Sequence, residues 1–274
     1  MAARSARTWA PSQYLRFESS RLRPALDLLE RIILPHDAVS IVDLGCGTGN
    51  IAPFMRERWP DARIECVDSS LDMLASARTA HAAASIGNVQ YTQADFETFK
   101  VAEPVDVIFS NAALHWTSFE IHRTLLPRLL SFLKPGGCIA FQMPDSRRQA
   151  SHSLMAAAAA RIGQDVSAVR WVTTDVDPVE YYRLLAPLVG RSNVQLWTTE
   201  YVQLLEKVPG SHPVVDFTAS TGLGPYMNSM PDDATRAEFK ASYAELIAEA
   251  YPVEADGTVV FPFKRFFCIV SKES

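Results

Sequence analysis

The chain has 274 residues, 48% of them hydrophobic and 21% charged, so it can bury a sizeable core and is neither disordered nor fibrous. Its 26 Lys and Arg are outnumbered by 31 Asp and Glu, and the resulting formal net charge of -5 disfavours nucleic acid as a partner. No apolar stretch reaches the ~20 residues that cross a bilayer, so we expect a soluble, cytoplasmic protein with no membrane partner.

Two further features bear on compartment and metal content. The first 17 residues hold three arginines and no acid, which faintly resembles a transit peptide, but they show no sustained amphipathic face. Nothing in the sequence indicates an oligomeric state.

The cysteines lie far apart without a CxxC pair, so we expect reduced, buried thiols and no metal site; they are Cys46, Cys66, Cys138 and Cys268.

Helix and strand patterns alternate through the first half of the chain. Apolar residues spaced by three and four predict a helix over 21–34, and a β-branched run predicts a strand over 39–44. Strands that alternate with helices predict an α/β fold with a doubly wound, mostly parallel sheet. The elements that follow are helices at 50–59, 71–81 and 124–133 and strands at 62–67, 89–92, 105–110 and 137–143.

After Pro144 the alternation stops, and consecutive helical patterns indicate a cap over the sheet. The expected elements are helices at 151–162, 178–188, 213–220 and 232–251, a strand at 197–205 and a closing strand or hairpin at 258–270.

A glycine loop, Gly45-Cys46-Gly47-Thr48-Gly49, joins the first predicted strand to the next helix. A simple tight turn is the alternative, but a strand before the loop and a helix after it favour nucleotide binding. The GxGxG spacing departs from the GxGxxG of dinucleotide enzymes and disfavours an NAD-dependent oxidoreductase. Asp43 suits an ammonium group, such as that of S-adenosylmethionine (SAM), whose carboxylate can face the helix N-terminus beside Asn50.

Polar residues also follow the second and third predicted strands. Asp68 ends the second strand, where a carboxylate can accept hydrogen bonds from both ribose hydroxyls. Helix capping is the alternative, and the two roles can be divided between Asp68 and Ser69 or Ser70. Asp95 and Phe96 follow the third strand, where they would offer an adenine an acceptor and an aromatic face.

The fourth predicted strand ends in a segment, 110–116, that contains Asn111, His115 and Trp116. The carboxyl edge of such a sheet is where a substrate meets a cofactor. A buried Trp and a satisfied core His are equally good interpretations of either residue taken alone. In this order along the chain, the four motifs resemble class I SAM-dependent methyltransferases over about 39–145. That resemblance implies a seven-stranded, Rossmann-like methyltransferase sheet.

A more specific resemblance, to the trans-aconitate methyltransferases, spans nearly the whole chain and is weakest at 146–178. These enzymes esterify one carboxylate of a tricarboxylic acid. The matching residues are Trp9, Pro11, Tyr14, Phe17, Arg21, Arg23, Pro24 and Leu28-Leu29, followed by 110–116, 142–145, Tyr181-Tyr182, Thr221-Gly222-Leu223, Tyr251-Pro252 and 263–267.

The resemblance implies SAM as the cofactor, with S-adenosylhomocysteine as its product. It places Tyr14 and Arg21 at the cofactor, and Tyr181, Tyr226 and Arg265 at the substrate. It divides the chain into a lid and first helix (1–35), a SAM-binding core (36–145), a helical cap and substrate region with one core strand (146–235), and a C-terminal helix with closing strands of the core (236–274).

Arg265 lies in a hydrophobic strand, where its guanidinium offers a carboxylate of a small di- or tricarboxylic acid a bidentate match. An ion pair with a core acid, such as Asp106 or Glu200, that only supports the sheet is the alternative. Gly224 stands where some family members carry an arginine, so we expect looser discrimination among acids.

Methyl transfer to a carboxylate that is already ionised requires no general base. We therefore expect His115 and Trp116 to orient the acceptor through hydrogen bonds. Methylation of another small acid or of a phenol, and a non-catalytic SAM-binding protein, remain as alternatives.

Overall fold

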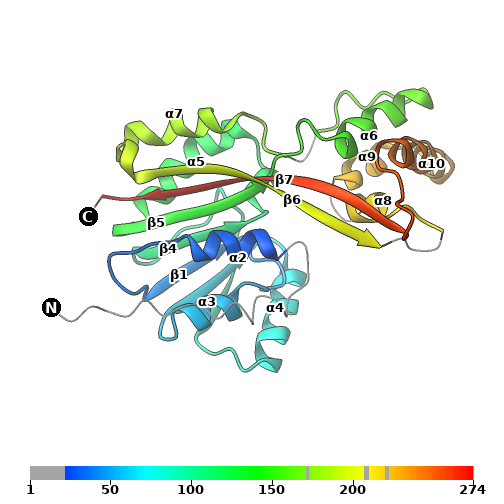
Figure 1. Ribbon diagram of the computed structural model, residues 1–274. Helices are drawn as coiled ribbons and strands as arrows, with labels where there is room; N and C mark the ends of the chain where they lie inside the picture. Colours follow the sequence, from blue (N-terminus) through cyan, green and yellow to red (C-terminus); the bar gives the residue numbers. More distant parts are fainter. Residues whose placement is uncertain (1–21, 171–172, 207–209, 220–221, 274) are drawn as a thin grey trace.

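The computed structural model describes residues 22–170, 173–206, 210–219 and 222–273 (Figure 1). Tyr14 and Arg21, and with them most of the expected lid, lie outside the described residues. No helix in these ranges combines the length and the apolarity that are required to cross a bilayer.

One seven-stranded sheet forms the centre of the molecule, in the order β3-β2-β1-β4-β5-β7-β6. The strands β1 to β5 pair in parallel, and β7 runs antiparallel to both of its neighbours. The doubly wound, mostly parallel, seven-stranded sheet expected from the sequence is confirmed. The strands are β1 (Ser40–Leu44), β2 (Arg63–Asp68), β3 (Val89–Gln93), β4 (Val105–Asn111), β5 (Leu133–Pro144), β6 (Val194–Glu206) and β7 (Thr258–Ser271).

Helices cover both faces of this sheet. On one face, α2 (Arg23–Glu30) and α3 (Ala52–Arg58) pack against β1, β2 and the C-terminal half of β7. On the same face, α4 (Leu71–Ala83) contacts β2 and β3, with its His81 and Arg78 against Tyr91 of β3. On the other face, α5 (Phe119–Ser131) and α7 (Pro178–Val189) pack against β4, β5 and β7. Residues such as Leu29 and Leu126 are fully buried, and each such side chain contributes ~1.5–3 kcal/mol to folding.

The helix expected at 124–133 begins earlier, at Phe119, because Ser118 caps it: its hydroxyl accepts a hydrogen bond from the Ile121 N–H. The strand expected at 137–143 begins earlier as well. It starts at Leu133, which pairs with Val105 across an irregular register, so the residues between the expected helix and the expected strand belong to β5.

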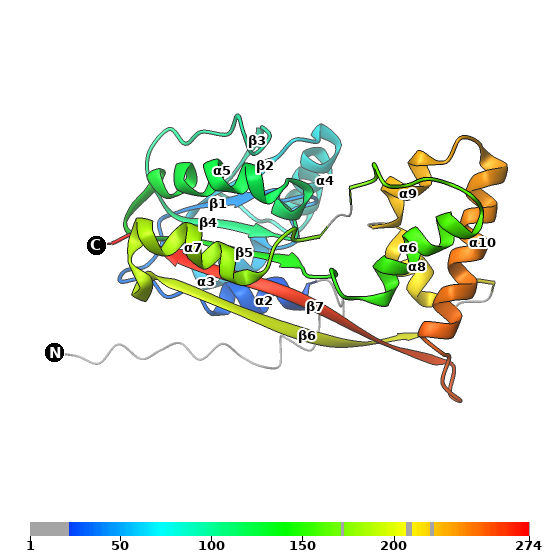
Figure 2. The ribbon, with the colours of Figure 1, turned by 90° about the horizontal axis from the view of Figure 1, so that it is seen from above.

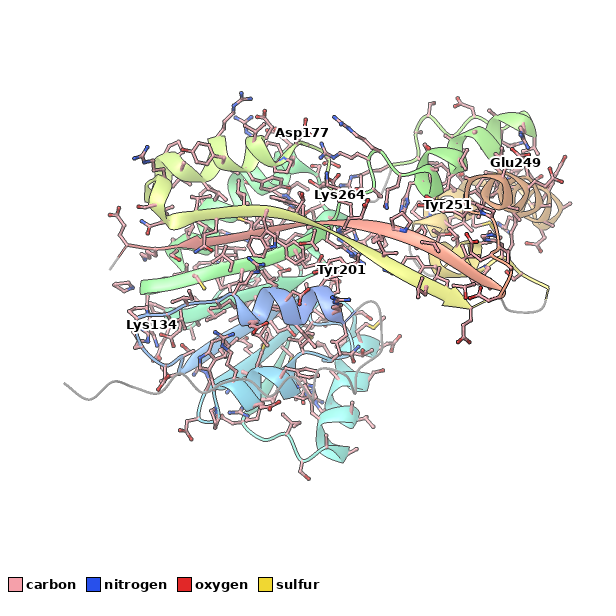
Figure 3. All side chains as sticks on the ribbon, viewed as in Figure 1. Lys134, Asp177, Tyr201, Glu249, Tyr251 and Lys264 are labelled. Atoms are coloured by element: carbon pink, nitrogen blue, oxygen red, sulfur yellow. The ribbon has the colours of Figure 1, made fainter. Side chains whose placement is uncertain are left out.

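The cap is a separate apolar cluster at one end of β6 and β7 (Figure 2). It contains α6 (Ala150–Arg161), α8 (Pro213–Ala219), α9 (Leu223–Ser229) and α10 (Asp233–Ala250). The sequence did not predict α9. Figure 3 shows Tyr251 at this end of the molecule and Lys134 at the opposite end of the sheet.

The helices α7 and α10 do not pack in the part of the molecule to which the sequence assigned them. The range 146–235 was expected to be cap, but Tyr181 and Leu185 of α7 pack on Phe266 and the core sheet. The range 236–274 was expected to belong to the core, but Phe239 and Tyr243 of α10 pack in the cap. Apolar periodicity marks the buried face of a helix and not the partner that covers it, which explains both differences.

The long strand β7 links the two parts. Phe261 and Phe263 belong to the cap cluster, and Phe267 lies in the core on the face covered by α2. Phe266 and Cys268 face α7 instead. Because side chains alternate along a strand, Arg265 shares the face of Phe263 and Phe267, between core and cap.

Candidate active site

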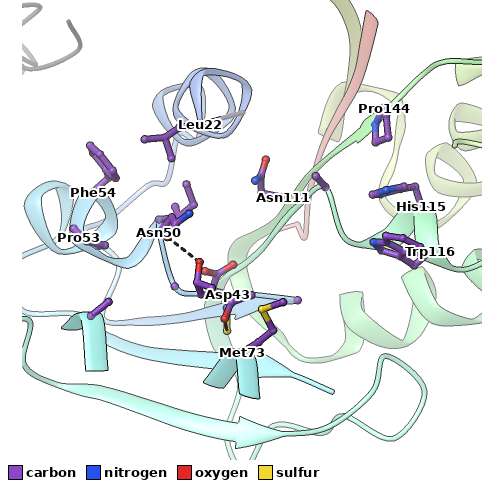
Figure 4. A pocket seen from close by; sticks show the side chains of 18 of the residues that line it. Leu22, Asp43, Asn50, Pro53, Phe54, Met73, Asn111, His115, Trp116 and Pro144 are labelled. Carbon is purple, nitrogen blue, oxygen red and sulfur yellow. Dashed lines mark hydrogen bonds between the residues drawn. The ribbon is translucent and has the colours of Figure 1, made fainter. Parts of the chain in front are cut away.

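A cavity of about 900 Å³ opens at the carboxyl edge of the sheet and reaches the cap (Figure 4). This volume lies in the upper part of the ~300–1,000 Å³ range of small-molecule sites. The lining includes nine of the residues singled out from the sequence, namely Asp43, Gly45, Cys46, Gly47, Asn50, Asn111, His115, Trp116 and Arg265.

The glycine loop forms the core side of the cavity. Gly45 has a φ of 78°, and a Cβ there would come within 2.4 Å of the Ala113 Cβ, so the loop packs tightly against the segment after β4. Gly47 has a φ of 55°, and a Cβ there would meet nothing within 4 Å. A side chain at Gly47 would therefore occupy open space that a ligand can use.

His81 supports this loop from α4 and was missed in the sequence. Its Nε2 lies 2.8 Å from the Gly49 carbonyl oxygen, and its Nδ1 lies 2.8 Å from the Tyr91 hydroxyl. A Cβ at Gly49 would come within 2.5 Å of Nε2. The residue lies 32 positions from Gly49 on a helix, and no local motif marks it.

Asp68 holds the loop in place. Its Oδ2 accepts a hydrogen bond from the Gly47 N–H at 2.9 Å, and its Oδ1 accepts one from the Ser70 N–H at 2.9 Å. Ser70 is the helix cap, because its hydroxyl accepts the Met73 N–H, while Ser69 is exposed. Neither Asp68 nor Ser69 lines the cavity, so contact of either residue with a ribose stays a prediction.

Asp43 is a buried acid at the floor of the cavity, with only 2% of its surface exposed. Burial, and secondarily the negative charge of Asp68, raise the pKa of its carboxyl to about 7. A buried carboxyl of this kind gains most from a cationic partner, since burial disfavours its ionised form in isolation.

Asp95 and Phe96 do not line the cavity. The Asp95 Oδ1 accepts hydrogen bonds from the Thr98 hydroxyl and backbone N–H and from the Glu97 N–H, and these bonds lower the pKa of its carboxyl. The Phe96 ring lies 3.5 Å from the Cβ position of Gly45, at the back of the glycine loop. Their contact with an adenine stays a prediction.

The turn after β4 presents His115 and Trp116 to the cavity. It begins with Ala112 at a φ of 47°, an uncommon conformation for a residue with a side chain. Arg170 holds the turn by donating hydrogen bonds to the carbonyl oxygens of His115, Trp116 and Thr117. Trp116 is 52% exposed, which excludes its interpretation as a buried core residue.

His115 is buried in the cavity wall, and among the described residues its Nδ1 has no hydrogen-bond partner. Burial lowers the pKa of its imidazole to about 3, helped by the positive charges of Arg265 and Arg170. The ring is therefore neutral near pH 7 and can donate or accept a hydrogen bond without carrying charge.

Arg265 lines the cavity from β7, with its guanidinium 4.5 Å from the centre of the Phe263 ring. Asp106 lies elsewhere, since it accepts hydrogen bonds from the Ser40 N–H and from Lys134 Nζ. Glu200 stands opposite Lys264 in the β6–β7 register, on the other face from Arg265. Both of these acids therefore lie away from the Arg265 side chain.

Two tyrosines expected at the substrate do not line the cavity, and that expectation is corrected. Tyr181 is fully buried in α7, where its hydroxyl lies 2.8 Å from His122 Nδ1 and its ring packs on Phe266. Phe266 and Arg265 are on opposite faces of β7, which explains the error. Tyr226 stacks on Phe239 inside the cap.

Among the described residues, no group of three or more His, Cys, Asp or Glu side chains is arranged to hold a metal ion. The cysteines expected to be reduced thiols are free, and all but the partly exposed Cys46 are buried.

The fold is similar to solved structures at low sequence identity. The YcgJ protein from Bacillus subtilis matches with a TM-score of 0.59 at 14% identity, over 92% of this chain and 99% of that one. A putative methyltransferase from Bacillus halodurans matches with a TM-score of 0.57 at 12% identity, over 92% and 100%. At such low sequence identity, these similarities are evidence for the fold alone.

Comparisons of sequence are more specific. Residues 41–137 match the family described as "Methyltransferase domain". The trans-aconitate 2-methyltransferase of Azoarcus sp. (strain BH72) is 40% identical over 262 residues, or 96% of this chain and 98% of that protein. The enzyme of the same name from Streptomyces avermitilis is 40% identical over 280 residues, or 97% and 98%. Similarity of this degree along nearly the whole length shows that the chain belongs to the trans-aconitate methyltransferase family of class I methyltransferases.

Proposed function

We propose that this protein transfers the methyl group of SAM to a carboxylate of trans-aconitate, forming a methyl ester. One observation carries the proposal: a single cavity joins the open glycine loop to the cationic side chain of Arg265. The names of the relatives support the choice of acid. Asp43 lies beside the glycine loop and Arg265 lies on β7 toward the cap, so the cavity offers separate places for an ammonium and for a carboxylate.

The residues present fit SAM. Open space at Gly47 admits a ligand close to the backbone, and the buried Asp43 offers a partner for an ammonium. When bound, SAM supplies an electrophilic methyl group on a sulfonium. Asp43 would bind the ammonium of its amino-acid end, and Asn111, at the end of β4, would lie between the cofactor and the acid.

The protein's residues bind, orient and shield the reacting groups. Arg265 pairs with the acid, and His115 and Trp116 offer hydrogen-bond donors for the acceptor carboxylate. A phenol would have to lose a proton, and an imidazole with a pKa of about 3 is a weak base for that task. A carboxylate is already ionised near neutral pH, so the neutral His115 favours an acid over a phenol as acceptor.

A screen of di- and tricarboxylic acids for SAM-dependent methyl acceptance tests this proposal. We expect trans-aconitate to give the highest kcat/KM. Binding of SAM without turnover of any acid would instead indicate a non-catalytic SAM-binding protein, and preference for a phenol would assign a different substrate class.

Replacing Asp68 by Ala is expected to weaken SAM binding by ~1–3 kcal/mol, because the change leaves the Gly47 N–H without its partner and removes the expected acceptor for the ribose. Isothermal titration calorimetry measures the effect. Asp72→Ala removes an exposed acid from the first turn of the neighbouring helix and serves as the control. SAM affinity equal to that of the wild type would refute a role for Asp68.

SAM affinity is expected to rise between pH 6 and pH 8. The raised pKa of Asp43 means that the buried carboxyl is mostly protonated at pH 6 and mostly ionised at pH 8, and only the ionised form pairs with an ammonium. With a pKa near 7, the ionised fraction, and with it the affinity, changes by up to ~tenfold over this interval. Asp43→Asn should remove the contribution of this group to the pH dependence. An identical profile in wild type and variant would contradict the assignment.

A further inference from the structure

The turn after β4 is fixed by a residue that lies outside the cavity, Arg170, in the segment between α6 and α7. Its guanidinium donates hydrogen bonds to the carbonyl oxygens of His115, Trp116 and Thr117, at distances of 3.0, 3.2 and 2.8 Å. The side chains of His115 and Trp116 line the cavity, and Arg170 does not (Figure 4). Arg170 therefore contacts the backbone of the turn and leaves its side chains to the ligand.

Asp175 completes this arrangement. Its Oδ1 accepts a hydrogen bond from the Arg170 guanidinium at 2.9 Å, and its Oδ2 accepts one from the Phe119 N–H at 2.8 Å. Phe119 is the first residue of α5, which follows the turn directly. The Arg170–Asp175 ion pair thus binds the carbonyl oxygens of the turn on one side and the first N–H of the next helix on the other.

The segment that carries this ion pair is itself attached to the end of β5. The Thr174 N–H donates to the Pro144 carbonyl oxygen at 3.1 Å. The Thr173 hydroxyl accepts from the Ser146 N–H at 2.9 Å and donates to the Pro144 carbonyl oxygen at 3.1 Å. Both threonines are buried. Arg170 and Asp175 are therefore anchored on the sheet before any ligand arrives, so little freedom is lost on binding.

The turn has little regular structure of its own to fix it. Ala112 has a φ of 47°, and the helix that follows is a 3₁₀ helix of only three residues, Leu114–Trp116. Such helices have poorer hydrogen-bond geometry than α-helices, and the carbonyl groups at a helix end lack partners within the helix. A guanidinium can bind several of these carbonyl oxygens at once, because it offers five donors in one rigid plane.

The orientation of this turn matters for methyl transfer. The displacement requires the acceptor oxygen to lie in line with the methyl group, and a misplacement of about 1 Å can lower a rate ~100-fold. Arg265 approaches the acid from β7, whereas His115 and Trp116 approach it from the turn. Binding of the acid and orientation of its reacting carboxylate can therefore be separated by experiment.

We propose that Arg170, together with Asp175, is a positioning residue for the methyl acceptor. It fixes the turn after β4 so that the side chains of His115 and Trp116 meet the acceptor carboxylate in one orientation. This inference rests on the proposed function, since it assumes a carboxylate against His115 and Trp116. Arg170 touches neither substrate nor cofactor and acts only through the turn.

A double-mutant cycle tests this inference. The variants are Arg170→Ala, a variant with both His115→Ala and Trp116→Phe, and the combination of all three changes. Arg170→Lys and Asp175→Asn are milder changes that test the same ion pair if Arg170→Ala does not fold. Arg183→Ala removes an exposed arginine with an ion pair of its own on α7 and is the control. The measured quantities are kcat and KM for trans-aconitate, SAM affinity and Tm.

We expect Arg170→Ala to lower kcat ~10–100-fold, with a smaller change in KM and none in SAM affinity, because Arg265 still binds the acid. Arg170→Lys and Asp175→Asn should lose part of the rate, since an ammonium lacks the planar fork and an amide lacks the charge. Arg170→Ala should have little further effect once the side chains of His115 and Trp116 are removed.

Three results would overturn the inference. They are a wild-type kcat in Arg170→Ala, additive losses in the combined variant, and a fall in Tm and SAM affinity that accounts for the lost rate. Absence of methyl transfer from the wild type to any acid would instead refute the proposed function.

Discussion

Arg265→Ala is expected to raise KM for trans-aconitate by the equivalent of ~2–5 kcal/mol, with SAM affinity and Tm nearly constant. The magnitude is that of leaving a buried carboxylate without its charged partner. Arg265 is 6% exposed and lies on the cavity face of β7, so water cannot easily replace it. Arg265→Lys should recover only part of the loss, because an ammonium cannot reproduce the bidentate geometry.

The adjacent Lys264 provides the matched control for this variant. Lys264→Ala removes the same unit of charge from the same strand, but Lys264 points to the other face and lies 3.6 Å from Asp145. We expect KM for the acid to change little in that variant. If Arg265→Ala lowered Tm and left KM unchanged, Arg265 would be a structural residue.

Gly47→Val is expected to abolish SAM binding and leave the protein folded. Its Cβ would enter the open space at the glycine loop, and a β-branched residue would also be strained at a φ of 55°. Loss of the calorimetric signal with SAM, together with a retained unfolding transition, is the expected result.

Gly257→Val separates the two effects of that substitution. Gly257 has a φ of 87° and nothing within 4 Å of its Cβ position, and it lies in a turn before β7, away from the cavity. This variant carries comparable backbone strain and should bind SAM normally. Normal SAM affinity in Gly47→Val would show that the loop is only a turn.

The sheet and the core side of the cavity could be predicted because their signals are local. The GxGxG loop, the acid at Asp43 and the segment 110–116 lie at the ends of strands, and parallel strands bring their carboxyl ends to one edge. Periodicity located most elements to within a few residues. The main shift was the start of α5, which depends on the Ser118 cap.

The cap side could not be predicted in the same way, because its residues meet only through tertiary packing. His152 of α6 and Gly222, just before α9, both line the cavity but stand 70 positions apart in the chain, with no spacing rule that joins them. The family resemblance implied that Tyr181 and Tyr226 contact the substrate, but both are buried in apolar clusters and neither lines the cavity. Arg265 was identified because a cation is unusual in a hydrophobic strand.

The central claim, carboxyl methylation of trans-aconitate, is tested most directly by recovering the product. The purified protein is incubated with SAM labelled in its methyl group and with trans-aconitate, and the acid is analysed by mass spectrometry before and after mild alkaline hydrolysis. We predict that one labelled methyl group appears on trans-aconitate with stoichiometric S-adenosylhomocysteine, and that alkali releases it as methanol, as expected of an ester. Label that remains on the acid after alkali, or no transfer to the acid although SAM binds, would contradict the account.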